Sequence, residues 1–159
     1  MAEELQISEG LGRSQRYEEL LPQLEAMIAA ERDTIATLAN LSAALHQAFG
    51  FHWVGFYVVK DDELVVGPFQ GPVACTRIAK GRGVCGTAWE QAKTLIVPDV
   101  HAFPGHIACS ALSRSEIVVP VFDQAGGVWA VLDIDSSEPD DFSDVDRQAL
   151  EQVAAMLKR

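Results

Sequence analysis

The hydrophobic positions in the first third of the chain repeat with the spacing of amphipathic helices. One stripe consists of Tyr17, Leu20, Leu21, Leu24, Met27 and Ile28. A second consists of Ile35, Leu38, Leu41, Leu45 and Phe49. Positions three and four residues apart share one helix face, so the stripes predict two helices. Asp33 or Thr34 is a suitable N-cap for the second helix, and Gly50 is a suitable stop. Residues 1–14 are expected to form a loose tail.

After residue 50 the pattern changes from helical to strand-like. Four segments are rich in aromatic and β-branched residues, as strands are, at 53–59, 64–69, 116–122 and 127–135. The turns at 60–63 and 123–126 join them into two hairpins. Shorter strands are expected near 74–78 and 94–97. Hairpin connections predict an antiparallel sheet.

The remaining segments predict two helices and one long loop. One helix is expected over 83–91, and another begins near Ser143, where Asp146 gives a variant of the capping box. The stripe of this last helix consists of Val145, Ala149, Val153, Met156 and Leu157. Residues 101–115 form a long connection, of the kind that often carries function. The predicted fold class is α+β, with helices mainly on one face of the sheet and a single domain over 15–159.

Composition and charge narrow the class of protein. The chain has 159 residues, of which 48% are hydrophobic, so one ordinary domain with a real core is expected. The net charge is −11, from 12 basic and 23 acidic residues, which disfavours binding to nucleic acid or to anionic membranes. The apolar runs are too short to span a bilayer, and the acidic N-terminus has no signal-peptide pattern. We therefore expect a cytoplasmic protein.

Three cysteines, Cys75, Cys85 and Cys109, carry the most distinctive chemistry of the sequence. They are 10 and 24 residues apart, without the close pairs typical of structural zinc sites, so no metal is expected. Buried, inert thiols remain a plausible interpretation of any one of them. However, the cysteines stand beside glycine, proline or polar residues, and Cys109 lies in the long loop near His101 and His106. In a reducing compartment, this context favours redox chemistry over a structural disulfide.

A pair of acids on the last predicted strand gives a second candidate feature. Asp133 and Asp135 point to the same face because side chains alternate along a strand, and Trp129 is expected to share that face. The pair is either a solvated edge or the floor of an electronegative pocket, which Glu116 would join. Trp53 is likewise either a core residue or the wall of a ligand pocket.

The stretches around these residues carry a family resemblance. They are WVGFY at 53–57, GPFQG at 67–71, AC at 74–75, GRGVCGTA at 81–88, DVH at 99–101, GHIAC at 105–109, SRSEIVVP at 113–120 and VLDIDS at 131–136. Together they resemble the free methionine-(R)-sulfoxide reductases, which are stand-alone GAF-domain enzymes. All three cysteines stand at the family spacing. One departure is Ser110, where the family pattern has an aspartate.

The resemblance implies a GAF domain and assigns roles to the thiols. Cys109 would attack the sulfoxide sulfur and become a sulfenic acid, which a second thiol condenses to a disulfide. Cys75 is the first choice for this resolving role, and Cys85 is the alternative or a relay. An external dithiol reductant, thioredoxin by family analogy, would reset the enzyme without any bound cofactor.

The resemblance also gives the acids a function. Glu116, Asp133 and Asp135 would share the tasks of protonating the sulfoxide oxygen and holding the substrate ammonium. Trp53 would pack on the thioether end of free methionine-(R)-sulfoxide. A homodimer is compatible with the predicted helices. The alternatives are a non-catalytic GAF sensor of a small molecule or redox state, which has no need for three thiols, and a metal-binding redox switch, which the cysteine spacing disfavours.

Overall fold

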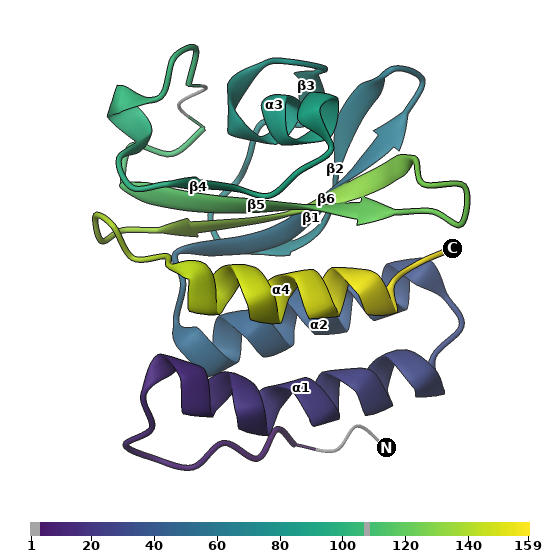
Figure 1. The fold of residues 1–159 in the computed structure, drawn as a ribbon, viewed down its shortest axis with the longest axis vertical. Helices are drawn as coiled ribbons and strands as arrows, with labels where there is room; N and C mark the ends of the chain where they lie inside the picture. Colours follow the sequence, from purple (N-terminus) through teal and green to yellow (C-terminus); the bar gives the residue numbers. More distant parts are fainter. Residues whose placement is uncertain (1–3, 107–108) are drawn as a thin grey trace.

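An antiparallel sheet divides the molecule into two unequal halves (Figure 1). The computed structural model describes residues 4–106 and 109–159. Below the sheet lie three helices, α1 (Arg13–Ala30), α2 (Thr34–Phe49) and α4 (Asp144–Met156), with α2 and α4 against the sheet and α1 beneath them. Above it lie α3 (Gly83–Gln91) and long loops. The predicted α+β class with helices mainly on one face is confirmed.

The sheet contains both predicted hairpins. Its strands are β1 (Trp53–Lys60), β2 (Glu63–Gln70), β3 (Arg77–Ala79), β4 (Leu95–Val97), β5 (Ser115–Phe122) and β6 (Val128–Ser136). Their order is β3-β2-β1-β6-β5-β4, so the hairpins β1–β2 and β5–β6 join through the antiparallel pair β1–β6. This central pairing places the first residue of β1, Trp53, directly opposite Asp135 of β6. The register therefore brings distant motifs together.

Helix boundaries follow the predicted capping residues. Asp33 caps α2, where its carboxylate accepts a hydrogen bond from the backbone N–H of Ala36, and Gly50 ends it with a φ of 67°. The prediction that Ile35 lies on the buried face of this helix was wrong, since Ile35 is 71% exposed. It lies in the first turn of α2, and the buried face of this helix begins only at Leu38.

A buried carboxylate connects α1 to α4. The predicted capping box of α4 is present between Ser143 and Asp146. Asp146 also accepts hydrogen bonds from the Tyr17 hydroxyl at 2.7 Å and from Arg13 Nη1 at 3.0 Å. Because both donors belong to α1, this one side chain caps α4 and fixes the outer helix against it. Within the described residues, no helix is long and apolar enough to cross a membrane.

The segment before α1 makes specific contacts, although the sequence suggested a loose tail. The backbone N–H and hydroxyl of Ser8 both donate to the Glu19 carboxylate, at 2.8 and 2.7 Å. The backbone N–H of Gln6 donates to Gln23 Oε1 at 2.8 Å. Ile7 packs against the main core. Polar side chains on the outward face of α1 thus supply partners that a helical pattern does not reveal.

A β-bulge corrects the predicted orientation of Trp129. Val121 pairs with Ala130 and Phe122 with Val128, so Trp129 is an extra residue on β6. Such a bulge interrupts the strict alternation of side chains. Trp129 consequently packs in the helix-side core, where the Arg159 guanidinium lies 3.6 Å from its ring centroid. The prediction that Trp129 shares the face of Asp133 was wrong.

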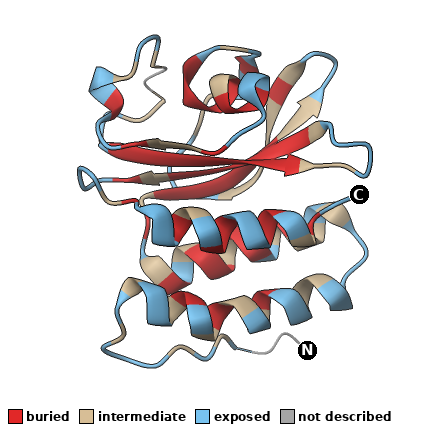
Figure 2. Ribbon diagram, in the orientation of Figure 1, coloured by how far each residue is buried: buried red, intermediate tan, exposed pale blue. Residues whose placement is uncertain are grey.

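The two faces of the sheet bury separate hydrophobic clusters, and Figure 2 shows the sheet buried along most of its length. The larger cluster lies on the helix side. The smaller one lies under α3 and includes Trp53, Tyr57, Cys85 and Trp89. The thiols and acids selected from the sequence belong to this second face.

Candidate active site

A pocket on the α3 face gathers the predicted site residues. Its empty volume is about 560 Å³, a figure that includes the open solvent at its mouth. Six of the seven candidates line it, namely Trp53, Cys85, Cys109, Glu116, Asp133 and Asp135. The seventh, Cys75, is bonded to Cys109. Segments far apart in sequence thus converge on one cavity.

Neighbouring strands position the three acids. Glu116 of β5 pairs with Asp135 of β6, and Val118 pairs with Asp133 two residues away. Alternation along the strands turns all three carboxyl groups toward the pocket. Glu116 and Asp133 are each 6% exposed. The acidic residues form a pocket wall, and the alternative of a solvated edge does not hold.

The environment of these acids favours their neutral forms. Burial raises the pKa of Glu116 well above its usual value, and the nearby Asp133 and Asp135 raise it further. Burial also raises the pKa of Asp135 well above its usual value, although the Ser113 hydroxyl, which donates to Asp135 Oδ1 at 2.8 Å, acts in the opposite sense. Carboxyl groups of this kind retain a proton that they can donate.

Cys85 lies against the same acids. It belongs to the first turn of α3, and its Sγ lies 3.8 Å from Glu116 Oε1. Close packing fixes this turn, since a Cβ at the next residue, Gly86, would overlap the carbonyl oxygen of Ala79. Burial, followed by the charges of Asp133 and Glu116, raises the pKa of the Cys85 thiol. Cys85 is therefore held as a neutral thiol.

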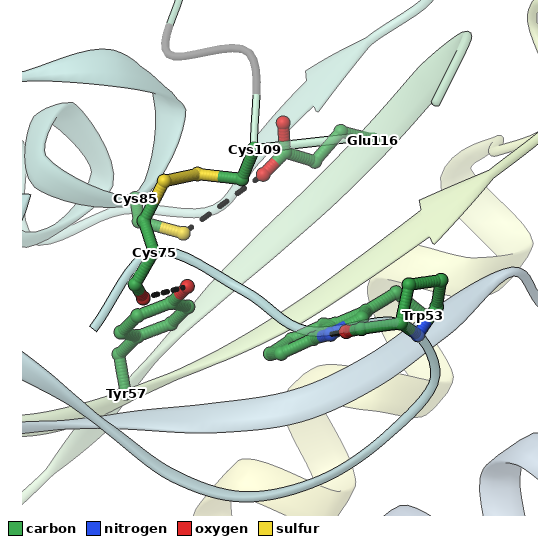
Figure 3. The surroundings of a disulfide bond; sticks show 7 residues. Trp53, Tyr57, Cys75, Cys85, Cys109 and Glu116 are labelled. Atoms are coloured by element: carbon green, nitrogen blue, oxygen red, sulfur yellow. Dashed lines mark hydrogen bonds between the residues drawn. A yellow bond between two sulfur atoms is a disulfide. The ribbon is translucent and has the colours of Figure 1, made fainter. Parts of the chain in front are cut away.

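Cys75 and Cys109 form a disulfide beside the acidic pocket (Figure 3). Cys75 lies in the segment between β2 and β3, and Cys109 in the loop that precedes β5. The Tyr57 hydroxyl donates to the backbone carbonyl of Cys75 at 2.9 Å. Both cysteines are partly exposed, which is required for attack by an external thiol. Two residues of the GHIAC motif, 107–108, lie outside the described residues.

Trp53 is a pocket wall and a core residue at once. Its indole stacks on Phe69 and Tyr57, with ring centroids 5.0 and 5.8 Å apart, and only 5% of the residue is exposed. Its Nε1 donates to the carbonyl oxygen of Pro72 at 3.1 Å. The adjacent Gly71, with a φ of +135°, leaves room for the indole edge. The ring is thus fixed before any ligand binds.

Two polar contacts at the site escaped sequence reasoning. Ser113 supports Asp135, as described above, and His52 Nε2 lies 2.9 Å from Ser110 Oγ, next to Cys109. His52 precedes β1, 58 positions from Ser110 in the chain. No spacing rule connects residues so far apart, so only the fold reveals this anchor of the cysteine loop.

Comparison with known proteins identifies the family. A GAF domain model matches residues 33–158. A free methionine-R-sulfoxide reductase of Escherichia coli K12 is 45% identical over 150 residues, which cover 94% of this chain and 90% of that one. The chain belongs to the free methionine-R-sulfoxide reductase family.

Other members of this reductase family, or proteins similar to it, span the whole chain. GAF domain-containing protein A of Dictyostelium discoideum is 57% identical over 158 residues, 99% of each chain. The X-ray structure of the free methionine-R-sulfoxide reductase of Neisseria meningitidis in complex with its substrate superposes with a TM-score of 0.94. The identity is 51%, with coverage of 97% of this chain and 92% of that one. The resemblance and the GAF fold inferred from the sequence are confirmed.

Proposed function

We propose that this member of the family reduces free L-methionine-(R)-sulfoxide to L-methionine. The observation that carries the proposal is a disulfide, Cys75–Cys109, beside a pocket lined by three carboxyl groups, two of which are buried. A reductase needs a thiol that accepts oxygen, a second thiol that removes it and a proton donor. Cys109, the adjacent Cys75 and the acids of the pocket are groups of these three kinds.

The first step transfers the sulfoxide oxygen to Cys109. The Cys109 thiolate attacks the sulfoxide sulfur, while a neutral carboxyl group protonates the oxygen. Glu116 is well suited to this donation because its raised pKa keeps it protonated. The sulfur is reduced, methionine leaves, and Cys109 retains the OH group as a sulfenic acid.

The second step closes the disulfide. The Cys75 thiol displaces the OH group of the sulfenic acid, which leaves as water, and the Cys75–Cys109 bond forms. Cys85 is less suited to this role, since its buried thiol has a raised pKa and thiolate is the reactive form. An external protein dithiol of the thioredoxin class then reduces the disulfide and becomes oxidised itself.

Substrate selection follows from the same pocket. The ammonium of a free amino acid favours the ionised form of an acid such as Asp133 or Asp135 and pairs with it, whereas a peptide nitrogen carries no charge. The Trp53 indole supplies an apolar surface for the thioether end. Peptide-bound methionine sulfoxide leaves the acids unpaired and adds chain on both sides, so the pocket excludes it.

The direct test is methionine release from four substrates. The R and S epimers of methionine sulfoxide, each free and within a peptide, are incubated with the protein and dithiothreitol. Turnover of the free R epimer alone is expected. The Cys109→Ser variant is the matched control and should release no methionine. Equal turnover of peptide-bound substrate, or no turnover of any substrate, would contradict the proposal.

A further inference from the structure

Three potential metal ligands meet in the interior of the pocket. Cys85 Sγ and carboxylate oxygens of Glu116 and Asp133 all lie within 4.8 Å of one another, and all three residues are buried. Among the described residues, the buried Asp133 Oδ1 has no permanent hydrogen-bond donor, and the groups that can bond to the Asp133 carboxyl are the titratable Cys85 and Glu116. An unpaired buried carboxylate oxygen is costly, so a buried site that leaves one free points to a missing ligand.

The spacing of the ligands fits a small tetrahedral cation. Zinc binds thiolate at about 2.3 Å and carboxylate oxygen at about 2.0–2.2 Å, which places two tetrahedral ligands about 3.6 Å apart. The observed separation of Cys85 Sγ and Glu116 Oε1 is 3.8 Å. One thiolate and two carboxylates form a mixed donor set that suits Zn²⁺, whereas Mg²⁺ and Ca²⁺ prefer oxygen alone.

The charge of the cluster also favours a cation. Cation binding displaces the protons of Cys85, Glu116 and Asp133, and the three ionised ligands together then carry three negative charges. Within residues 4–106 and 109–159, no Lys or Arg forms a salt bridge with any of them. Arg82 lines the same pocket without pairing with these groups. A divalent cation would balance most of this charge.

We propose that Cys85, Glu116 and Asp133 form a three-ligand site for Zn²⁺ or a cation of the same borderline class, with the fourth position open to the pocket. Three protein ligands and one exchangeable position are the usual arrangement of an accessible zinc site. The inference rests in part on the proposed function, because the cation occupies the acidic group that the substrate ammonium would use. Cation and free amino acid therefore compete.

The redox state of the protein makes this site testable. When Cys75 and Cys109 are joined, Cys85 is the remaining thiol of the chain. A thiolate–metal signal from the oxidised protein therefore reports on Cys85 alone. It does not depend on catalytic activity, so its failure and the failure of the proposed function are separate results.

The experiment titrates oxidised, untagged protein with Co²⁺ and records the near-ultraviolet charge-transfer band of a cobalt–thiolate bond. We expect the band to saturate at one equivalent and to disappear when Zn²⁺ is added. Cys85→Ser should lack the band, and Asp133→Asn should weaken binding at least tenfold. Absence of the band in the wild-type protein, or its persistence in Cys85→Ser, would overturn the site.

Matched variants separate this site from surface binding. His101 and His106 lie close together, with ring centroids 6.4 Å apart, and could hold Co²⁺ without a thiolate. His101→Ala should therefore leave the band unchanged, as should Asp62→Asn in the exposed β1–β2 turn. Loss of the band in either variant would contradict the assignment. Asp133→Asn provides an independent reading if Cys85→Ser fails to fold.

Competition is measured on the same oxidised protein, which cannot turn over. Free methionine should displace Co²⁺ and remove the band, whereas N-acetylmethionine, which lacks the ammonium, should not. Glycine at the same concentration controls for chelation in solution. A band that is insensitive to saturating free methionine would overturn the shared site.

Discussion

At the residue scale, the raised pKa that suits Glu116 to proton donation also lowers the stability of the folded state at neutral pH. Glu116 is buried, and burial with two neighbouring carboxyl groups raises its pKa well above the usual value. The folded state therefore binds a proton that the unfolded chain would release at neutral pH. Such a group contributes its full stability only below the unfolded carboxyl pKa of about 4, and the contribution declines as pH rises toward the folded pKa.

The Glu116→Gln variant tests this cost. Glutamine resembles the neutral acid but does not titrate, so the variant should gain stability over the wild-type protein as pH rises from about 4 to 8. One unit of pKa difference corresponds to about 1.4 kcal/mol, which sets the scale of the gain. Melting temperatures across this range, measured with EDTA present, provide the comparison. Glu18→Gln, on the exposed face of α1, is the control and should show no such trend. A constant gap between Glu116→Gln and the wild-type protein would contradict the raised pKa.

The contact between His52 and Ser110 is expected to hold the Cys109 loop in place. A typical hydrogen bond is worth about 1 kcal/mol, so His52→Ala should lower kcat/KM for free methionine-(R)-sulfoxide about fivefold. Ser110→Ala should have a similar effect. If the two residues act through their mutual contact, the double variant should be no worse than either single variant. Additive losses in steady-state kinetics would show that they act independently.

At the element scale, buried polar contacts fix α1 onto α4. One oxygen of Asp146 accepts hydrogen bonds from Tyr17 and Arg13 of α1. Its second oxygen accepts a hydrogen bond from the backbone N–H of Ser143 at the start of α4. These contacts lie on the face of the sheet opposite to the pocket. They should therefore support the fold more than the reaction.

Asp146→Ala is expected to destabilise the protein by about 2–4 kcal/mol, because it leaves the buried Tyr17 hydroxyl without an acceptor and removes one of the two carboxylates that pair with Arg13. Urea unfolding gives the free energy of unfolding directly. Asp144→Ala, in the same helical turn but with 71% of its side chain exposed, should cost less than about 1 kcal/mol. Equal losses in the two variants would mean that the buried contacts contribute nothing specific.

The elements that sequence patterns predicted are those with a local cause. The hairpins were predictable because strand-like segments flank short turns, and α2 was predictable because Asp33 and Gly50 bracket an apolar stripe. The bulge at Trp129 was not, since an extra residue in a strand leaves no mark on composition. The ordered N-terminal segment also escaped prediction, because its partners are polar residues of α1.

At the scale of the whole molecule, the fold brings distant segments to one pocket. The alternation rule predicted that Asp133 and Asp135 share a face, and strand pairing adds Glu116. The family motifs selected the cysteines, but no spacing rule placed Cys75 against Cys109 across 34 positions. The support from Ser113 and His52 likewise depends on tertiary structure. The sequence therefore identifies the reacting groups, and the fold determines which residues surround them.

The most direct measurement counts methionine and thiols in a single turnover. Fully reduced protein, freed of external reductant, is mixed with excess free methionine-(R)-sulfoxide. We expect one methionine per chain, a decrease from three thiols to one, and a Cys75–Cys109 bond identified by mass spectrometry. Cys75→Ser should still release one methionine per chain, and Cys109→Ser none. Methionine release by Cys109→Ser, or a bond between Cys109 and Cys85 in the wild-type protein, would contradict the account.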